Sequence, residues 1–391
     1  MEDHQTSSRP TRAVFAAQLP PPVHGQAVAD AILADAGDDT LSLTVVPLRF
    51  ARNVEDIGRL RPGKLAAVVA LIVRLLVARF RHSADVLVYS LGARSRLPVL
   101  RDGLVLAATR PFYRRTVLHA HTGDYGERIA AERGLVGAVL RRAFGGAELI
   151  LLDPALDRPE ARTPAPARVS YLNYGVVDPA VGSRSTPTGE PLILFLGNLY
   201  ETKGTHVLLR AAALLRDRGH EFRVVLAGAI PDEQTGEELR ELIASKGLDD
   251  RVELPGPVHG DDKNRRLAEA TVMCFPTHYE AEGLPLVVLE GLAAGLPVVS
   301  TVWRAIPAAV VDGETGALVT PGDVEALADR LGELLDDPTL IERLGTAARK
   351  RYEERFSIER FRANFTAIVR GIDRTPTDPA ADLTTPTPAR S

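Results

Sequence analysis

Apolar runs and amphipathic segments alternate along most of this chain. The apolar runs are rich in Val, Ile, Leu and Ala and have the length of buried strands, and apolar residues at helical spacing lie between many of them. This alternation is typical of parallel sheets whose two faces are covered by helices. The pattern therefore predicts an α/β fold.

The predicted elements fall into two series. The strands expected in the first series are 13–17, 41–46, 86–89, 115–119, 148–152 and 169–172. Those expected in the second are 192–196, 222–226, 252–254, 272–276, 297–300 and 317–319. The predicted helices are 26–36, 63–81, 205–216, 233–246, 324–335 and 339–356, with a short one before 297. A Ser/Thr/Pro/Gly-rich stretch, 182–189, separates the series and predicts a linker between two domains, 12–183 and 190–356.

Composition agrees with a globular enzyme. The 391 residues suffice for two cores, and the single cysteine, Cys274, excludes an internal disulfide. The N-terminus lacks the basic and apolar regions of a signal peptide, and the longest apolar run, 65–73, is too short to span a bilayer. We therefore expect a cytoplasmic protein. The Pro/Thr-rich tail 375–391 and residues 1–11 are expected to be disordered.

Charge is distributed unevenly. The whole chain has a net charge of −4, whereas residues 52–142 contain 17 Lys and Arg against 7 Asp and Glu. Such a basic region can attract an anionic membrane surface, and the amphiphilic segment 64–81 lies inside it. The alternative is an ordinary set of solvated helix faces. We expect peripheral contact with an anionic membrane.

Two glutamates stand eight positions apart in the second series. Glu282 follows the predicted strand 272–276, in the loop at the strand's carboxyl end, where open α/β sheets bind ligands. Glu290 starts the next predicted helix and can reach the same ligand. A carboxylate suits a ribose, because two adjacent hydroxyls can donate to its two oxygens. Alone, either residue could be a solvated loop or helix-start charge.

The sequence from 272 to 300 closely resembles the donor-sugar site of retaining glycosyltransferases, above all glycosyltransferase family 4. The resemblance implies the GT-B architecture, in which two Rossmann-like domains face a cleft and a closing helix, here 357–372, crosses back to the first domain. The N-terminal domain would bind the acceptor and the C-terminal domain the nucleotide sugar. Glu282 would contact the transferred sugar and Glu290 the ribose. The donor site would also include Gly283, Leu284, Pro285 and Leu286.

The segment from Phe195 to Gly204 resembles the phosphate-binding segment of the same family. A glycine turn follows a strand, and Lys203 stands just before the next helix, whose N-terminus favours phosphate. Lys203 matches the family's phosphate-binding lysine, and an exposed residue at a helix start is the alternative. Asn198 stands where the family most often has arginine, which removes one cation from the expected diphosphate site.

Three further segments resemble parts of the family's cleft. Gly25 follows the first strand in a Pro-Pro-x-His-Gly loop, where a glycine allows close approach of a ligand to the backbone. His121 resembles the histidine near the reaction centre. The pair formed by His119 and His121 could instead suggest a metal site, but no third ligand motif is evident in the sequence. Val258 matches the segment whose main chain meets the base.

These features predict a retaining, metal-independent glycosyltransferase of the hexosyltransferase type. Its donor would be a nucleoside-diphosphate sugar and its acceptor a lipid-linked or other glycan, with no metal or other cofactor and no nucleic acid. The catalytic candidates are His121, Glu282 and Lys203. A non-catalytic sugar-nucleotide-binding or glycan-binding subunit is the main alternative, favoured by Asn198 and by Ala308 where the family has glutamate. A sugar-nucleotide epimerase is another. A dinucleotide oxidoreductase would need a Gly-x-Gly-x-x-Gly motif after a strand, and this sequence contains none.

Overall fold

The computed structural model describes residues 9–21, 25–48, 63–92, 96–121, 125–157, 164–179 and 189–372. Residues 182–188 of the expected linker 182–189, residues 1–8 and the tail 375–391 lie outside these ranges. Of the N-terminal segment expected to be disordered, Thr11 already belongs to the first strand.

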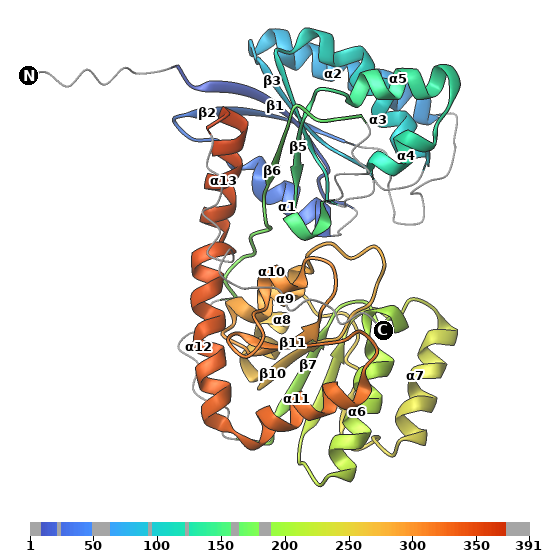
Figure 1. The fold of residues 1–391 in the computed structure, drawn as a ribbon, viewed down its shortest axis with the longest axis vertical. Coiled ribbons are helices and arrows are strands. Elements are labelled where there is room, and N and C mark those ends of the chain that lie inside the picture. Colours follow the sequence, from blue (N-terminus) through green and yellow to red (C-terminus); the bar gives the residue numbers. More distant parts are fainter. Residues whose placement is uncertain are drawn as a thin grey trace, which may run out of the picture.

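Six parallel strands form the N-terminal sheet, in the order β2-β1-β3-β4-β5-β6 (Figure 1). The strands are β1 (Thr11–Ala17), β2 (Leu41–Pro47), β3 (Val86–Ser90), β4 (Arg115–His119), β5 (Glu148–Leu151) and β6 (Arg168–Tyr171). The helices around them are α1 (Gly25–Ala34), α2 (Gly63–Arg81), α3 (Arg96–Thr109), α4 (Tyr125–Ala131) and α5 (Gly134–Phe144).

Strand β1 is buried on both faces, as expected for the interior of a parallel sheet. Successive side chains point to opposite faces, so Phe15 packs in the core that includes Leu33 of α1, while Val14 belongs to the core that includes Leu71 and Leu75 of α2. The period of two in this strand thus places helices on both sides of the sheet.

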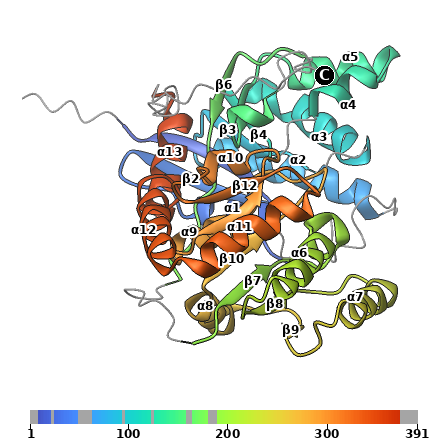
Figure 2. The same cartoon turned by 60° about the horizontal axis from the view of Figure 1, so that its bottom comes forward.

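A second sheet of six parallel strands has the order β12-β11-β10-β7-β8-β9. The strands are β7 (Leu192–Leu196), β8 (Arg223–Ala227), β9 (Val252–Glu253), β10 (Val272–Phe275), β11 (Val298–Thr301) and β12 (Gly316–Val319). The helices are α6 (Thr205–Asp217), α7 (Glu233–Ser245), α8 (Gly260–Glu269), α9 (Leu286–Ala293), α10 (Ile306–Ala309) and α11 (Val324–Asp336). Helices α6 and α11 lie side by side (Figure 2).

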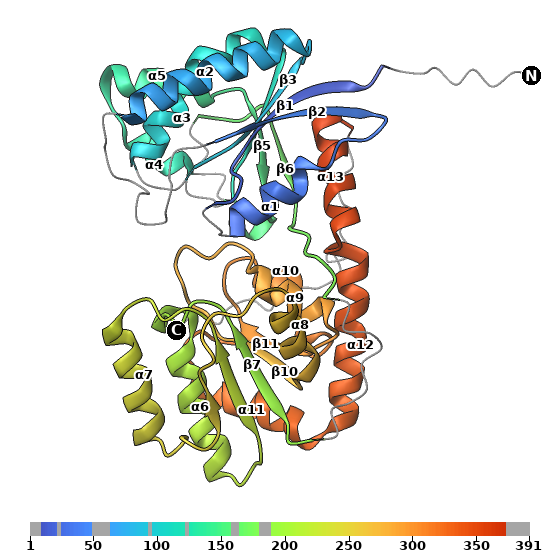
Figure 3. The same cartoon turned by 180° about the vertical axis from the view of Figure 1, so that it is seen from behind.

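Two consecutive helices connect the domains. Helices α12 (Pro338–Arg355) and α13 (Ile358–Arg370) follow one side of the molecule from the second domain to the first (Figures 1 and 3). Phe365 of α13 packs on Phe15 with ring centroids 5.5 Å apart. Arg115 of β4 donates to the Val369 carbonyl at 2.9 Å. Helix α13, the last helix within the described residues, is therefore part of the N-terminal domain's core.

The two parallel sheets with their helices confirm the predicted α/β fold with two Rossmann-like domains. Helices α3, α4, α5, α8 and α10 were not predicted. In α3 the buried set includes Asp102 and Gly103 as well as apolar residues, and α8 buries only Leu267, so neither has the apolar period on which the prediction depended. Within the described ranges, no helix has the length and apolar character needed to cross a membrane.

Candidate active site

Glu282 lies in the loop between β10 and α9 and forms an ion pair with Lys203. The Lys203 Nζ to Glu282 Oε2 distance is 2.6 Å, and both side chains are largely buried. The hydroxyl of Thr277 lies 3.3 Å from the same carboxylate oxygen. The Lys203 ammonium also lies 4.5 Å from the centre of the Tyr279 ring, within cation–π range. Two of the predicted site residues are thus direct neighbours.

The sheet topology explains this pairing. Strands β7 and β10 are adjacent at the point where the strand order reverses, so the loops after them meet at one edge of the sheet. Lys203 ends a single 3₁₀ turn, Glu201–Lys203, in the loop after β7. Gly204 follows with φ +91°, and a Cβ there would lie 2.2 Å from the Pro276 carbonyl oxygen. Glycine at 204 therefore allows the Lys203 loop to lie directly against the Glu282 loop.

Glu290 lies in α9 and forms a second ion pair, with Lys263 of α8. The Lys263 Nζ to Glu290 Oε1 distance is 2.7 Å, and the Glu290 side chain is mostly buried. Sequence reasoning missed Lys263. The only signal available was its position on the segment after Val258, because α8 has almost no buried apolar face. The site thus holds two lysines and two carboxylates.

The backbone between the two glutamates contacts the N-terminal domain. A Cβ added to Gly283 would lie 3.0 Å from the His121 carbonyl oxygen, so the two loops are in close contact. Leu284 is buried, Pro285 occupies the position just before the first residue of α9, and Leu286 lies near Gly25. The loop therefore brings part of the predicted donor site against two predicted cleft segments of the other domain.

Asn198 and Val258 lie at the edge of this site. Asn198 is exposed in the loop after β7, and Val258 is half-buried in the loop between β9 and α8. Among the described residues, neither shares a hydrogen bond with Lys203, Glu282 or Glu290. The sequence prediction for these two residues stays a prediction.

The ring of His121 points into its own domain. Its Nδ1 lies 2.6 Å from the Tyr174 hydroxyl, and its Nε2 lies 3.2 Å from Ser90 Oγ and 3.5 Å from Asp30 Oδ1. The ring of Tyr174 stacks on that of His121. The main chain of His121, rather than its imidazole, faces Gly283. Its predicted role at the reaction centre therefore depends on the backbone or on a change of ring orientation.

Burial and charge shift the pKa values of two side chains that contact His121, namely Asp30 and Tyr174. Burial acts to raise the pKa of the Asp30 carboxyl, but its interactions with His119 and His121 outweigh burial and bring the pKa below its usual range. Burial, followed by the negative charges of Asp30 and Glu282, raises the pKa of Tyr174 well above its usual value. Asp30 is thus ionised at neutral pH and the Tyr174 hydroxyl keeps its proton. Asp30 also lies beside His119 and His121, and it is the third potential metal ligand that was not evident in the sequence.

Comparison with known proteins agrees with this geometry. Residues 181–351 match the family model described as Glycosyl transferases group 1. The putative colanic acid biosynthesis glycosyltransferase WcaL of Salmonella typhimurium is 33% identical over 215 residues, which are 53% of this chain and 52% of the relative. The MMP alpha-(1->4)-mannosyltransferase of Mycolicibacterium hassiacum is 30% identical over 275 residues, 69% of this chain and 62% of the relative. The chain thus spans between half and two thirds of the length of these two curated relatives.

The fold extends the similarity over both domains. The structure of Anabaena HepE in complex with UDP and glucose matches with a TM-score of 0.67 at 17% identity, covering 92% of this chain and all of that one. At this identity the match establishes the shared fold. It agrees with the two Rossmann-like domains expected for GT-B proteins.

Proposed function

Because residues 181–351 match glycosyl transferases group 1, we propose that this chain is a retaining, hexosyltransferase-type glycosyltransferase that moves a sugar from a nucleoside-diphosphate sugar to a hydroxyl acceptor. The observation that carries the proposal is the pairing of Lys203 with Glu282 at the reversal point of the C-terminal sheet. A cation and a carboxylate side by side suit a ligand that has a diphosphate next to sugar hydroxyls.

In this proposal, Lys203 and the N-terminus of α6 stabilise the leaving group, the nucleoside diphosphate. The departing diphosphate accumulates negative charge, which a preorganised ammonium and free backbone N–H groups stabilise. When the diphosphate binds Lys203, it competes with Glu282 for the ammonium, so that Glu282 Oε2 becomes available to a sugar hydroxyl. Lys263 provides a second cation close to the ribose carboxylate Glu290, and it offsets Asn198 in the place of the family's arginine.

The acceptor hydroxyl must lose its proton during transfer. No second carboxylate has been assigned as a covalent nucleophile, so a diphosphate oxygen would take the proton of the acceptor hydroxyl. The two lysines supply the charge that a divalent ion supplies in metal-dependent transferases. Transfer should therefore proceed with EDTA present. Complete loss of transfer in EDTA that magnesium or manganese restores would contradict this part of the proposal.

The acceptor side of the proposal rests on an exposed surface of the N-terminal domain. Five large apolar side chains of α2 follow one another at spacings of three or four residues and are between 52% and 66% exposed: Leu65, Val69, Val73, Val77 and Phe80. Exposed apolar stripes of this kind are uncommon on monomeric proteins and are typical of helices that lie in a membrane interface. We call these five residues the α2 stripe.

Charge around the α2 stripe favours an anionic lipid surface. Several exposed arginines lie on α2 and around α5: Arg74, Arg81, Arg133, Arg141 and Arg142. Helix α5 adds the exposed side chains Leu135, Val136 and Val139. Both helices lie at the end of the molecule farthest from the C-terminal domain (Figures 1 and 3). We therefore place the reaction at the inner face of the cell membrane, with a lipid-linked or other glycan acceptor.

Vesicle cosedimentation tests the membrane contact. The chain should pellet with anionic vesicles at low salt and less at high salt, since each basic residue near the surface contributes about 1 kcal/mol before screening. Val73→Glu with Val77→Glu should abolish pelleting, whereas Val302→Glu, an exposed valine of the other domain, should not. Protein that stays in the supernatant at low salt contradicts the membrane contact and leaves the transferase proposal intact.

A non-catalytic binding subunit is the second candidate, favoured by Asn198 and Ala308. A thermal-shift panel of UDP, GDP and ADP and then their sugar conjugates identifies the donor, because a ligand that binds only the native state raises the melting temperature. No shift with any of these ligands contradicts both the transferase and a sugar-nucleotide-binding subunit, and leaves only a glycan-binding subunit. A shift without release of nucleoside diphosphate supports the second.

A further inference from the structure

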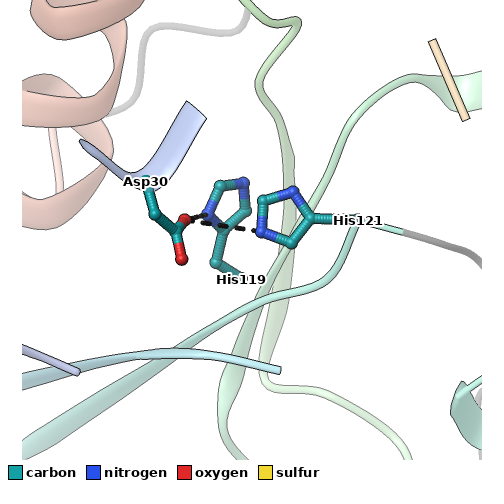
Figure 4. Close-up of side chains that lie close together, drawn as sticks. All are labelled: Asp30, His119 and His121. Carbon is teal, nitrogen blue, oxygen red and sulfur yellow. Dashed lines mark ion pairs between the residues drawn. The ribbon is translucent and has the colours of Figure 1, made fainter. Parts of the chain in front are cut away.

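Three buried side chains of the N-terminal domain converge on one point (Figure 4). Asp30 comes from α1, His119 ends β4, and His121 follows two residues later. Asp30 and His119 are fully buried and His121 nearly so. Asp30 Oδ1 lies 3.7 Å from His119 Nδ1 and 3.5 Å from His121 Nε2, and the imidazole centroids are 4.1 Å apart. We call these three residues the Asp-His-His cluster.

The contacts inside the cluster are too long for hydrogen bonds. An N–H to carboxylate hydrogen bond is usually about 2.7–2.9 Å long, and the separations here exceed that by more than half an ångström. Asp30 Oδ1 and both ring nitrogens of His119 have no hydrogen-bond partner within the described part of the chain. Buried polar atoms without partners are rare, and several at one point call for an ion or a water between them.

The two separations from Asp30 are close to those between the ligands of a tetrahedral zinc ion, and the three donor atoms all lie within 4.8 Å of one another. Ligand bonds of about 2.0–2.1 Å at the tetrahedral angle put adjacent donor atoms about 3.3 Å apart. The two Asp30 distances exceed that value by 0.2 to 0.4 Å, and Ser90 Oγ lies 3.2 Å from His121 Nε2. Imidazole nitrogens and a carboxylate oxygen are also the donors that zinc commonly binds. Geometry and donor set therefore agree.

The surroundings fix two of the three donors. The Tyr174 hydroxyl lies 2.6 Å from His121 Nδ1, so it can hold the tautomer with its proton on Nδ1, in which Nε2 presents its lone pair towards Asp30 Oδ1 and Ser90 Oγ. The backbone N–H of Gln18 donates to Asp30 Oδ2 at 2.8 Å, which leaves Oδ1 directed at the histidines. Hydrogen bonds of this kind to the far atoms of ligands are usual at zinc sites, where they orient the ligands.

We propose that Asp30 Oδ1, His119 Nδ1 and His121 Nε2 bind one zinc ion, with the fourth position beside Ser90 Oγ. The ion would join α1 to the end of β4 directly behind the His121 main chain that contacts the Gly283 loop. It would stiffen that wall of the site. It would not contact the diphosphate, so it lies outside the proposed transfer chemistry, and its test does not depend on that function.

Metal analysis of the purified full-length chain tests the proposal. Protein produced with zinc and then dialysed should hold about one zinc per chain. Asp30→Asn and His119→Gln should lower zinc content at least about 10-fold, because each removes a ligand of the site. His220→Gln is the matched control, since it removes a histidine of the other domain and should keep full zinc content.

A second measurement uses the unaltered chain and does not depend on how well the variants fold. After treatment with a strong chelator, added Zn²⁺ should raise the melting temperature, and Co²⁺ should give the visible absorption of a tetrahedral site. Wild-type protein that takes up no zinc and gives no cobalt spectrum would overturn the proposal. Equal zinc content in His119→Gln and His220→Gln would also overturn it.

Discussion

Replacing Gly204 by alanine should separate the two loops that form the site. Gly204 has φ +91° and a Cβ there would lie 2.2 Å from the Pro276 carbonyl oxygen. Gly219, just after α6, has φ +88°, and a Cβ there would lie in open space, so Gly219→Ala carries the same backbone strain without the clash. The pair of variants therefore isolates the contact between the Lys203 and Glu282 loops.

The magnitudes follow from these geometries. An alanine in the left-handed region of φ and ψ destabilises the folded state by roughly 1–2 kcal/mol. Alanine also lowers the entropy of the unfolded chain relative to glycine, which stabilises the fold by about 0.4–1 kcal/mol. Gly219→Ala should thus lower the free energy of unfolding by roughly 0–1.6 kcal/mol. In Gly204→Ala the loops must also move by about an ångström, and overpacking of this kind costs a further 1–3 kcal/mol or so.

Urea unfolding of both variants, with calorimetric titration of the nucleotide found in the thermal-shift panel, checks this prediction. Gly204→Ala should lose more stability than Gly219→Ala and should bind nucleotide more weakly, because Lys203 moves away from Glu282. Equal stability and equal nucleotide affinity in the two variants would refute the loop contact as the reason for a glycine at 204.

Other expected outcomes concern single contacts. Glu290→Ala should weaken nucleotide binding by about 1.5–3 kcal/mol, the value of a hydrogen bond to a charged group. Glu342→Ala, on the exposed face of α12, is the control and should leave nucleotide binding unchanged. Calorimetry that shows unchanged affinity in folded Glu290→Ala would contradict the assignment of Glu290 to the ribose. Lys203→Ala should lower turnover more than binding of the free nucleoside, since its charge matters most as the diphosphate leaves; equal turnover in variant and parent contradicts its role. Burial acts to raise the pKa of Glu148, but Arg115 and Arg168 outweigh it and lower the pKa. The Glu148 carboxylate therefore stabilises the fold at pH values above its unfolded pKa, and it loses that contribution as the pH falls through its folded pKa. The difference in free energy of unfolding between wild type and Glu148→Gln should thus shrink from pH 7 to pH 4. A constant difference in urea unfolding would contradict this.

The sequence predicted those parts of the fold that depend on local apolar pattern. Strands β4 and β7 and helix α2 have the predicted bounds, because their buried residues are continuous or regularly spaced. Helix α8 was missed because it is polar and buries only Leu267. Its absence from the prediction also concealed Lys263, whose role depends on a helix that the pattern does not show.

The candidate site could be predicted only where one local motif contains the residues. Glu282 and Glu290 share a single strand-loop-helix segment, and Lys203 follows the strand that the topology places next to it. Asp30, Tyr174 and His121 come from three distant segments that meet only in the folded domain. Local spacing contains no information about such a meeting, so neither the Asp-His-His cluster nor the inward orientation of the His121 ring was predicted.

Glycosyl transfer is the activity proposed for this chain, and it releases nucleoside diphosphate from the donor only when an acceptor is present. The donor selected by thermal shift should be incubated with a membrane extract as the source of acceptor, with Glu282→Ala as the matched variant. We expect acceptor-dependent release of nucleoside diphosphate, a product that keeps the anomeric configuration of the donor, and far slower release by Glu282→Ala. Tight donor binding without acceptor-dependent release, across the UDP, GDP and ADP sugars, would contradict it.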